Sequence, residues 1–396
     1  MCRDRILLIL LSTIVAATVF PIKVYSASKF NIIPKISAAW EMDSNFYLAQ
    51  DREREVYTYI VRPGFRAEFE AAKSYLMLDY TLDAYYYDDR DPVLPEETPS
   101  DEENYTGHTF SGQAKYQAFN RLLLGVDASS YITRDPGQSD TFSNTISRDK
   151  YTINRITPFV VYDFGHKFSA RVGYGHEDLD YSPEDREDSK ENRGMFDLIY
   201  NFTPKNSLDF EFQHWEKKYD GPTSDYTSNQ AKLIFRRQFK NFKISVGAGY
   251  QNRNFDDPGL DDLDAFTYNL SLDGGALIAN RRSYVSFEVE QNLNDQIASG
   301  NNYYIATRFI LSGGHEFSSK LLGHAEASYM IADYQLNDRK DNIYDFLGRI
   351  SYKFARWMIF SVEGGIENRD SNFEGRDYDN TYFSLTLDFA YDFAKN

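Results

Sequence analysis

Histidines are the first residues to consider for catalysis. His176 lies two residues before Asp178, and His214 lies two residues before Glu216, so each has an acidic residue nearby. An acyl hydrolase needs a histidine beside a nucleophilic serine, with a carboxylate or amide that orients the ring. Ser182 follows in the next connection, but no nucleophile motif surrounds it. We expect these histidines to lie at interfaces or turns, and we predict that the protein is not an enzyme.

Metal binding by histidine would require matched spacing and a further ligand. His166 and His176 fall at opposite ends of one expected strand, so they cannot share an ion. His315 and His324 flank an expected tight turn and could approach each other, but we expect them to be turn residues on the periplasmic rim. We predict no metal site and no cofactor.

Two acidic segments, residues 256–264 and 88–91, suggest calcium loops because each gathers several carboxylates. They lack the ordered ligand spacing and the glycine of such a loop, so we expect solvated connections. Divalent cations that bridge lipopolysaccharide phosphates near these loops are an alternative.

The elements that carry these residues are predicted to be long strands. Residues 383–393 alternate apolar or aromatic side chains with Ser, Thr, Asp and Ala. This period of two is typical of a strand, and about 9–11 residues of it are enough to cross a bilayer. The same pattern recurs along the chain, for example in residues 57–70, 76–84, 122–129, 242–250 and 266–273.

Short and long connections alternate between these segments, which gives about 18 strands, the first beginning near Pro34. The expected long connections include residues 253–264 and 293–302. We therefore predict an all-β fold, a transmembrane antiparallel β-barrel with short periplasmic turns and long extracellular loops. A β-propeller would show blade motifs, and a sandwich of this length would split into domains. Neither blade motifs nor a linker is present, so residues 27–396 are read as one barrel domain. Residues 88–104 or 135–150 could fold inward and narrow the lumen.

The first 26 residues resemble a secretory signal peptide, with Arg3 and Arg5 before an apolar run that is too short to span as a helix. Its cleavage would leave no cysteine, since Cys2 is the only one. The 31 Tyr and 30 Phe fit aromatic belts at a membrane interface. The net charge of −17 argues against a nucleic-acid partner. We expect a bacterial outer-membrane location, contact with lipid and lipopolysaccharide, and recognition of the aromatic last strand by the barrel-assembly machinery.

Strand parity assigns roughly twenty acids and twelve bases to the lumen, of which fourteen are singled out below as candidates. An excess of Asp and Glu favours cations in a pore, and a wide, wet lumen screens the preference. The pore-lining candidates are Arg62, Arg66, Glu68, Asp79, Asp83, Asp127, Arg171, Lys232, Arg236, Lys243, Asp273, Glu288, Arg308 and Glu363.

Residues 33–47 and 56–64 carry a corner, Asp43-Ser-Asn-Phe-Tyr47, and a Pro63-Gly64 pair. In these features the chain resembles porin-type outer-membrane β-barrels of Gram-negative bacteria, some of which are associated with exopolysaccharide or surface export. The resemblance implies a membrane barrel and supplies no catalytic residue.

The resulting hypothesis is a porin-like channel for passive passage of hydrophilic solutes, with weak cation selectivity. One alternative is a conduit for an exported polysaccharide, which would place Tyr and Trp side chains in the lumen as stacking platforms. Another is a non-conducting surface or adhesin-type barrel. The sequence does not specify the oligomeric state.

Overall fold

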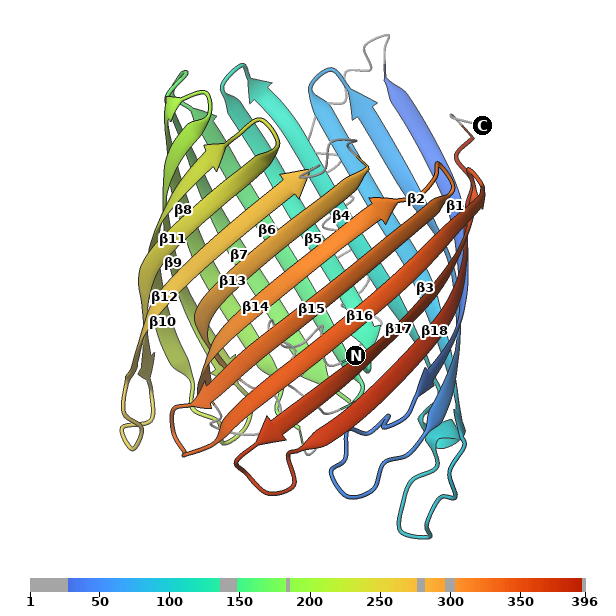
Figure 1. Cartoon of the computed structure of the whole chain (residues 1–396). Helices are drawn as coiled ribbons and strands as arrows, with labels where there is room; N and C mark the ends of the chain where they lie inside the picture. Colours follow the sequence, from blue (N-terminus) through green and yellow to red (C-terminus); the bar gives the residue numbers. More distant parts are fainter. Residues whose placement is uncertain (1–27, 136–147, 183–185, 276–281, 296–302, 394–396) are drawn as a thin grey trace.

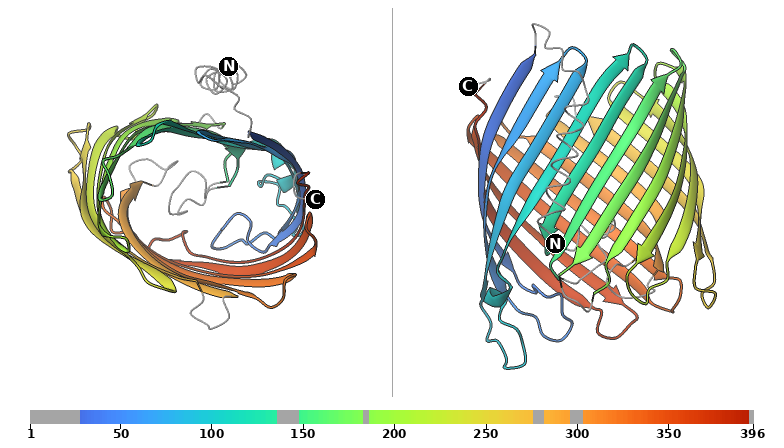
Figure 2. Two further views of the ribbon diagram at one scale, coloured as in Figure 1. Left: turned by 90° about the horizontal axis from the view of Figure 1, so that it is seen from above. Right: turned by 180° about the vertical axis from the view of Figure 1, so that it is seen from behind.

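The computed structural model describes residues 28–135, 148–182, 186–275, 282–295 and 303–393. Within these residues the chain forms one antiparallel sheet of 18 strands, and β18 pairs with β1. This pairing closes the sheet into a barrel, shown from the side in Figure 1 and from above and behind in Figure 2. The predicted fold class is confirmed. The predicted signal peptide lies outside the described residues.

The strands are 12 to 16 residues long. Their bounds are β1 Lys29–Asp43, β2 Val56–Ala71, β3 Ser74–Asp89, β4 Tyr105–Phe119, β5 Leu122–Thr133, β6 Tyr151–Asp163, β7 Phe168–Tyr181, β8 Ser189–Thr203, β9 Asn206–Tyr219, β10 Tyr226–Gln238, β11 Phe242–Phe255, β12 Leu263–Gly275, β13 Ser283–Asp295, β14 Tyr303–Glu316, β15 Leu321–Tyr334, β16 Lys340–Ala355, β17 Met358–Ser371 and β18 Tyr378–Ala390. One short 3-10 helix, η1 (Ser100–Glu103), precedes β4. No helix in the described part of the chain is long and apolar enough to cross a membrane.

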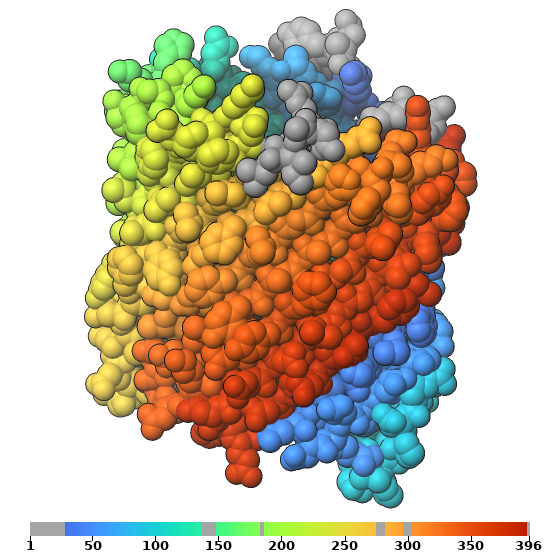
Figure 3. Space-filling view, viewed as in Figure 1, coloured from blue at the N-terminus to red at the C-terminus, as the bar shows by residue number. Residues whose placement is uncertain are grey.

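Alternation along each strand separates two faces, because successive side chains of a strand point to opposite sides of the sheet. Large apolar side chains on one face remain exposed: Leu311, Phe346 and Ile350 are 52%, 51% and 57% accessible. They belong to β14 and β16, and Figure 3 shows the continuous outer surface of this part of the wall. A water-soluble protein would bury such a surface, so this face requires an apolar surrounding.

Two kinds of connection alternate around the barrel, as predicted. The short ones include residues 72–73, 120–121, 164–167, 204–205 and 239–241, and the long ones include 44–55, 90–104 and 256–262. Because the number of strands is even, β1 begins and β18 ends on the same side of the barrel, which is the side with the short connections. We call the opposite end the long-connection end.

Three strand boundaries differ from those expected. The first strand begins at Lys29 rather than near Pro34, β11 continues to Phe255, and β13 continues to Asp295. Backbone pairing with neighbouring strands extends these elements into segments whose polar sequences suggest loops. Polarity at a barrel rim therefore does not mark the end of a strand.

Connection 44–55 folds inward, although the sequence pointed to residues 88–104 or 135–150 for this role. Phe46 is 4% exposed and packs with Val56, Tyr87 and Tyr105 on the inner side of the wall. Figure 2 shows this blue connection inside the ring. Connection 90–104 instead projects beyond the strand ends in Figure 1, and residues 136–147 lie outside the described residues.

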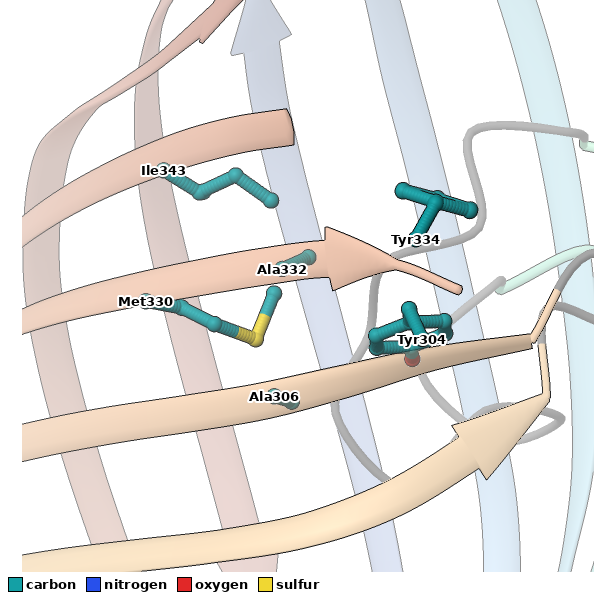
Figure 4. Close-up of a cluster of buried hydrophobic side chains, with 6 residues drawn as sticks. All are labelled: Tyr304, Ala306, Met330, Ala332, Tyr334 and Ile343. Carbon is teal, nitrogen blue, oxygen red and sulfur yellow. The ribbon is translucent and has the colours of Figure 1, made fainter. Parts of the chain in front are cut away.

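Another buried apolar cluster lies on the inner face near the long-connection end of β14–β16. Figure 4 shows its members, which are Tyr304, Ala306, Met330, Ala332, Tyr334 and Ile343. Tyr304 lies directly opposite Tyr334, and Ala306 lies opposite Ala332, so the cluster is built from residues at paired positions of β14 and β15. The alternation of apolar outward and polar inward side chains is therefore a rule with local exceptions, and this cluster is one of them.

Candidate functional site

The inner face of the barrel is identified by contacts between strands that are not neighbours. Lys35 on β1 forms an ion pair with Asp79 on β3, although β2 lies between them. Side chains can meet across an intervening strand only on the concave side of the wall. Residues that lie directly opposite each other on paired strands point to the same side of the sheet. The residues opposite Lys35 and Asp79 on β2, which are Gly64 and Arg66, therefore also lie on the inner face.

On β1–β3 the inner face carries a row of charged and phenolic groups. The Asp79 carboxylate lies between Lys35 and Arg66, and the Arg66 Nε donates to Asp79 Oδ2 at 2.8 Å. Arg62 donates to the Tyr85 hydroxyl at 2.9 Å and lies 3.6 Å from Asp83. Four of the predicted pore-lining residues therefore lie in two ionic groups on this face, Arg66 with Asp79 and Arg62 with Asp83.

On β9–β13 a second network joins further candidates. The Lys232 ammonium donates to Asn292 Oδ1 at 2.8 Å and lies 3.7 Å from Glu290. Arg236 pairs with Asp209 and with Glu211. A polar cavity of about 370 Å³ opens here, and its lining includes Lys232, Glu211, Glu290, Arg193 and Arg253.

Candidates on the remaining strands have local partners. Arg349 pairs with Glu363, and Gln113 donates to Asp127 Oδ1 at 2.8 Å. Arg171 lies over the Phe159 ring at 4.5 Å.

The last five candidates are placed by register. Lys243 lies directly opposite Asp273, and Arg308 lies opposite Glu290. Glu288 lies opposite Ser271, and Glu68 lies opposite Asn31. Side chains at every second position of a strand point to the same side of the sheet. By this rule all five residues point to the inner face, as the residues of the two networks do.

Inner-face tyrosines pack against one another rather than presenting open rings. Tyr85 and Tyr105 stack with their centroids 4.6 Å apart and their planes at 6°. Tyr87 and Tyr105 are only 7% and 9% exposed, and Trp215 is 4% exposed beneath the Arg193 guanidinium. A sugar needs an open ring face to stack on. These rings therefore do not form the stacking platform that a polysaccharide conduit would show.

Five of the six histidines have a hydrogen-bonding neighbour on a nearby strand. His176 lies 2.9 Å from Asn192 Oδ1, and His214 lies 2.8 Å from Asn229 Oδ1. His315 contacts Ser283, and the neighbouring His324 contacts Tyr284 rather than sharing a ligand with it. Among the described residues no group of three or more His, Cys, Asp or Glu side chains is arranged to hold a metal ion.

The acidic connections are organised by protein groups. Asp257 Oδ1 accepts the Gly259 N–H at 2.8 Å, and Glu97 accepts hydrogen bonds from Arg52 and from the Leu94 N–H. The Arg52 hydrogen bond lowers the pKa of Glu97, whereas burial, reinforced by Glu103, raises the pKa of Tyr47 in connection 44–55.

Sequence reasoning missed the best connected group at the long-connection end. Asp295 accepts hydrogen bonds from Lys217 Nζ at 2.6 Å, Tyr219 Oη at 2.7 Å and Tyr226 Oη at 3.1 Å, and it lies 3.6 Å from Arg253. Asp295 and Arg253 fall in segments that read as polar connections. No pattern of period two could bring four strands together at one carboxylate, so the sequence carries no signal for it.

Comparison with known proteins supports the architecture. The family model described as Putative beta-barrel porin 2 matches residues 244–391, which run from β11 to the end of β18. This match lies outside residues 33–64, on which the resemblance in the sequence was based. No curated protein matches the chain in sequence.

Solved structures share the fold at low identity. OccAB4 from Acinetobacter baumannii is 11% identical, with a TM-score of 0.53 over 92% of this chain and 98% of that chain. OpdK from Pseudomonas aeruginosa, solved with vanillate, is 10% identical, with a TM-score of 0.52 over 92% and 99%. Residues 244–391 thus match the model of a family of putative β-barrel porins, and the closed 18-stranded wall has the fold of these solved structures.

Proposed function

We propose that the protein is a channel for the passive passage of small hydrophilic solutes, with weak selectivity for cations. The observation that carries this proposal is the inner face, where charged side chains from β1–β3, β9–β13 and β16–β17 surround one lumen. An 18-stranded wall is too wide for its own side chains to fill, so this charged surface borders water.

Weak cation preference follows from how these charges are distributed. Most bases are engaged by acids, as in the pairs Arg66–Asp79 and Arg349–Glu363, which reduces their attraction for anions. Asp345 and Glu367 instead face each other as two acids. Unbalanced carboxylates raise the local cation concentration over a Debye length of about 8–10 Å at physiological salt.

Single-channel recording in a planar lipid bilayer tests the proposal. We expect discrete conductance steps, and a reversal potential under a potassium chloride gradient that shows modest cation preference and declines as salt rises. Anion preference would contradict the selectivity. Absence of conductance from correctly folded protein would replace the channel with a non-conducting surface barrel.

The proposal includes a signal peptide that is cleaved after residue 26, contact with lipopolysaccharide, and assembly by the barrel-assembly machinery. The supporting features are the outward apolar wall and the aromatic alternation of β18. Mass spectrometry of the protein from isolated outer membranes tests the cleavage, since the mature chain should begin at Ala27.

A further inference from the structure

The end of β13 leaves its neighbour in the wall. Pairing between β12 and β13 stops at Tyr268 and Gln291, although β12 begins five residues earlier, at Leu263. Beyond Gln291, β13 keeps only its pairing with β14, from Asn292 opposite Ala306 to Asp295 opposite Tyr303. A strand end that is no longer paired with one neighbour can bend away from the wall while it stays hydrogen-bonded to its other neighbour. Here the lost neighbour is β12 and the remaining one is β14.

The released end turns into the lumen and lies on the inner face of strands beyond β12. Gln230 and Lys232 of β10 both donate to Asn292 Oδ1, at 3.2 and 2.8 Å. Gln251 of β11 donates to the Leu293 carbonyl at 3.1 Å. These contacts pass across β12, so the end of β13 occupies space inside the ring.

Asp295 anchors this arrangement at its tip. Its carboxylate contacts Lys217 and Tyr219 of β9, Tyr226 of β10 and Arg253 of β11. Lys217 and Arg253 are 3% and 1% exposed, so their charges depend on this carboxylate for compensation.

Apolar packing supports the same contact from β14. Tyr303, which lies opposite Asp295 in the β13–β14 pair, is 1% exposed and packs with Trp215 and Tyr226. The Tyr303 ring also lies edge-on to Tyr226, with the centroids 6.0 Å apart. These ionic and aromatic contacts thus hold the end of β13 against the inner face of β9, β10 and β11.

We propose that Asp295 is a latch that holds the β13–β14 end inward, so that the latched state narrows the lumen near the long-connection end and release widens it. The inference rests on the proposed channel function, because a change in pore width matters only if the lumen conducts. It adds one residue whose charge sets the open area of the pore.

Asp295→Asn tests the latch, because the amide keeps the size of the side chain and removes the charge that compensates Lys217 and Arg253. A cysteine at Leu293, which is 3% exposed, reports the position of the strand end in a Cys2→Ser background that is otherwise free of cysteine. We expect Leu293→Cys to resist a polar thiol reagent when Asp295 is present and to react severalfold faster with Asp295→Asn. Single-channel conductance should rise in the same variant.

Glu288→Gln is the matched control for the thiol measurement. It removes a carboxylate from the same strand where β13 is paired on both sides, with Ser271 and with Ile310. It should leave the cysteine protected. Asn292→Ala is a second releasing variant in case Asp295→Asn does not fold, and it removes the acceptor of Gln230 and Lys232.

The readouts separate the latch from the channel function. Heat-modifiable gel mobility first confirms that each variant folds. Unchanged cysteine reactivity and conductance in both releasing variants would overturn the latch, and faster reaction without a rise in conductance would overturn the narrowing. A wild-type barrel that does not conduct would refute the channel, while the cysteine reactivity would still decide whether Asp295 holds the strand end.

Discussion

Asp345 on β16 and Glu367 on β17 lie directly opposite each other on the inner face of the barrel. Like charges at opposite positions of neighbouring strands are destabilising. The Tyr378 hydroxyl donates to Glu367 Oε1, which offsets part of this cost. The pair is therefore a place where the wall concentrates negative charge toward the lumen.

The double variant Asp345→Asn, Glu367→Gln should lose cation preference, because it removes the two facing carboxylates. The reversal potential under a potassium chloride gradient should move toward zero. Asp379→Asn is the control, since Asp379 lies opposite Asn368 on the outer face and should leave the reversal potential unchanged. An equal effect of both changes would mean that surface charge in general sets the preference, and not charge in the lumen.

The assignment of the lipid-facing and lumen-facing sides of the wall is tested at two adjacent residues of β18. Leu385 points outward and Ser384 lines an inner cavity of about 310 Å³. Leu385→Arg should cost about 2–4 kcal/mol of folding free energy near mid-bilayer, and Ser384→Arg much less. Urea titration of folding into lipid vesicles measures both. Similar costs at 384 and 385 would contradict the assigned faces.

The orientation of the barrel is tested by labelling cysteines on intact cells. Ser100 and Ser189 look suitable from the sequence, but they are 0% and 2% exposed. Glu96, in connection 90–104, is exposed and should be labelled by a membrane-impermeant reagent. Lys205→Cys, in a short turn, should be labelled only after the membrane is opened. The opposite pattern would place the long connections in the periplasm.

Gly64 is expected to tolerate no side chain. A Cβ there would lie 2.1 Å from the Tyr80 carbonyl oxygen, an atom of the neighbouring backbone. Gly64→Ala should therefore destabilise the barrel by about 1–3 kcal/mol, as overpacking does. Gly194→Ala is the control, because its Cβ would meet its nearest atom at 3.8 Å. The urea midpoint of the folded band on a gel compares the two, and equal midpoints would refute the steric argument.

The sequence by itself determined the barrel, its strand count and its two faces. A period of two in segments such as 242–250 dictates which side chains share a face, and alternating short and long connections dictate an antiparallel order. These are local properties of the chain, so they can be read without knowing which segments meet.

Only the tertiary structure decided which residues of the inner face act together. Lys35 and Asp79 meet because closure brings β1 and β3 onto one concave surface. Asp295 reaches Lys217 because β13 leaves β12 after Gln291 and turns inward. These contacts depend on where pairing stops and how far the wall curves, and both are set by the closure of the whole sheet rather than by the pattern within any one strand.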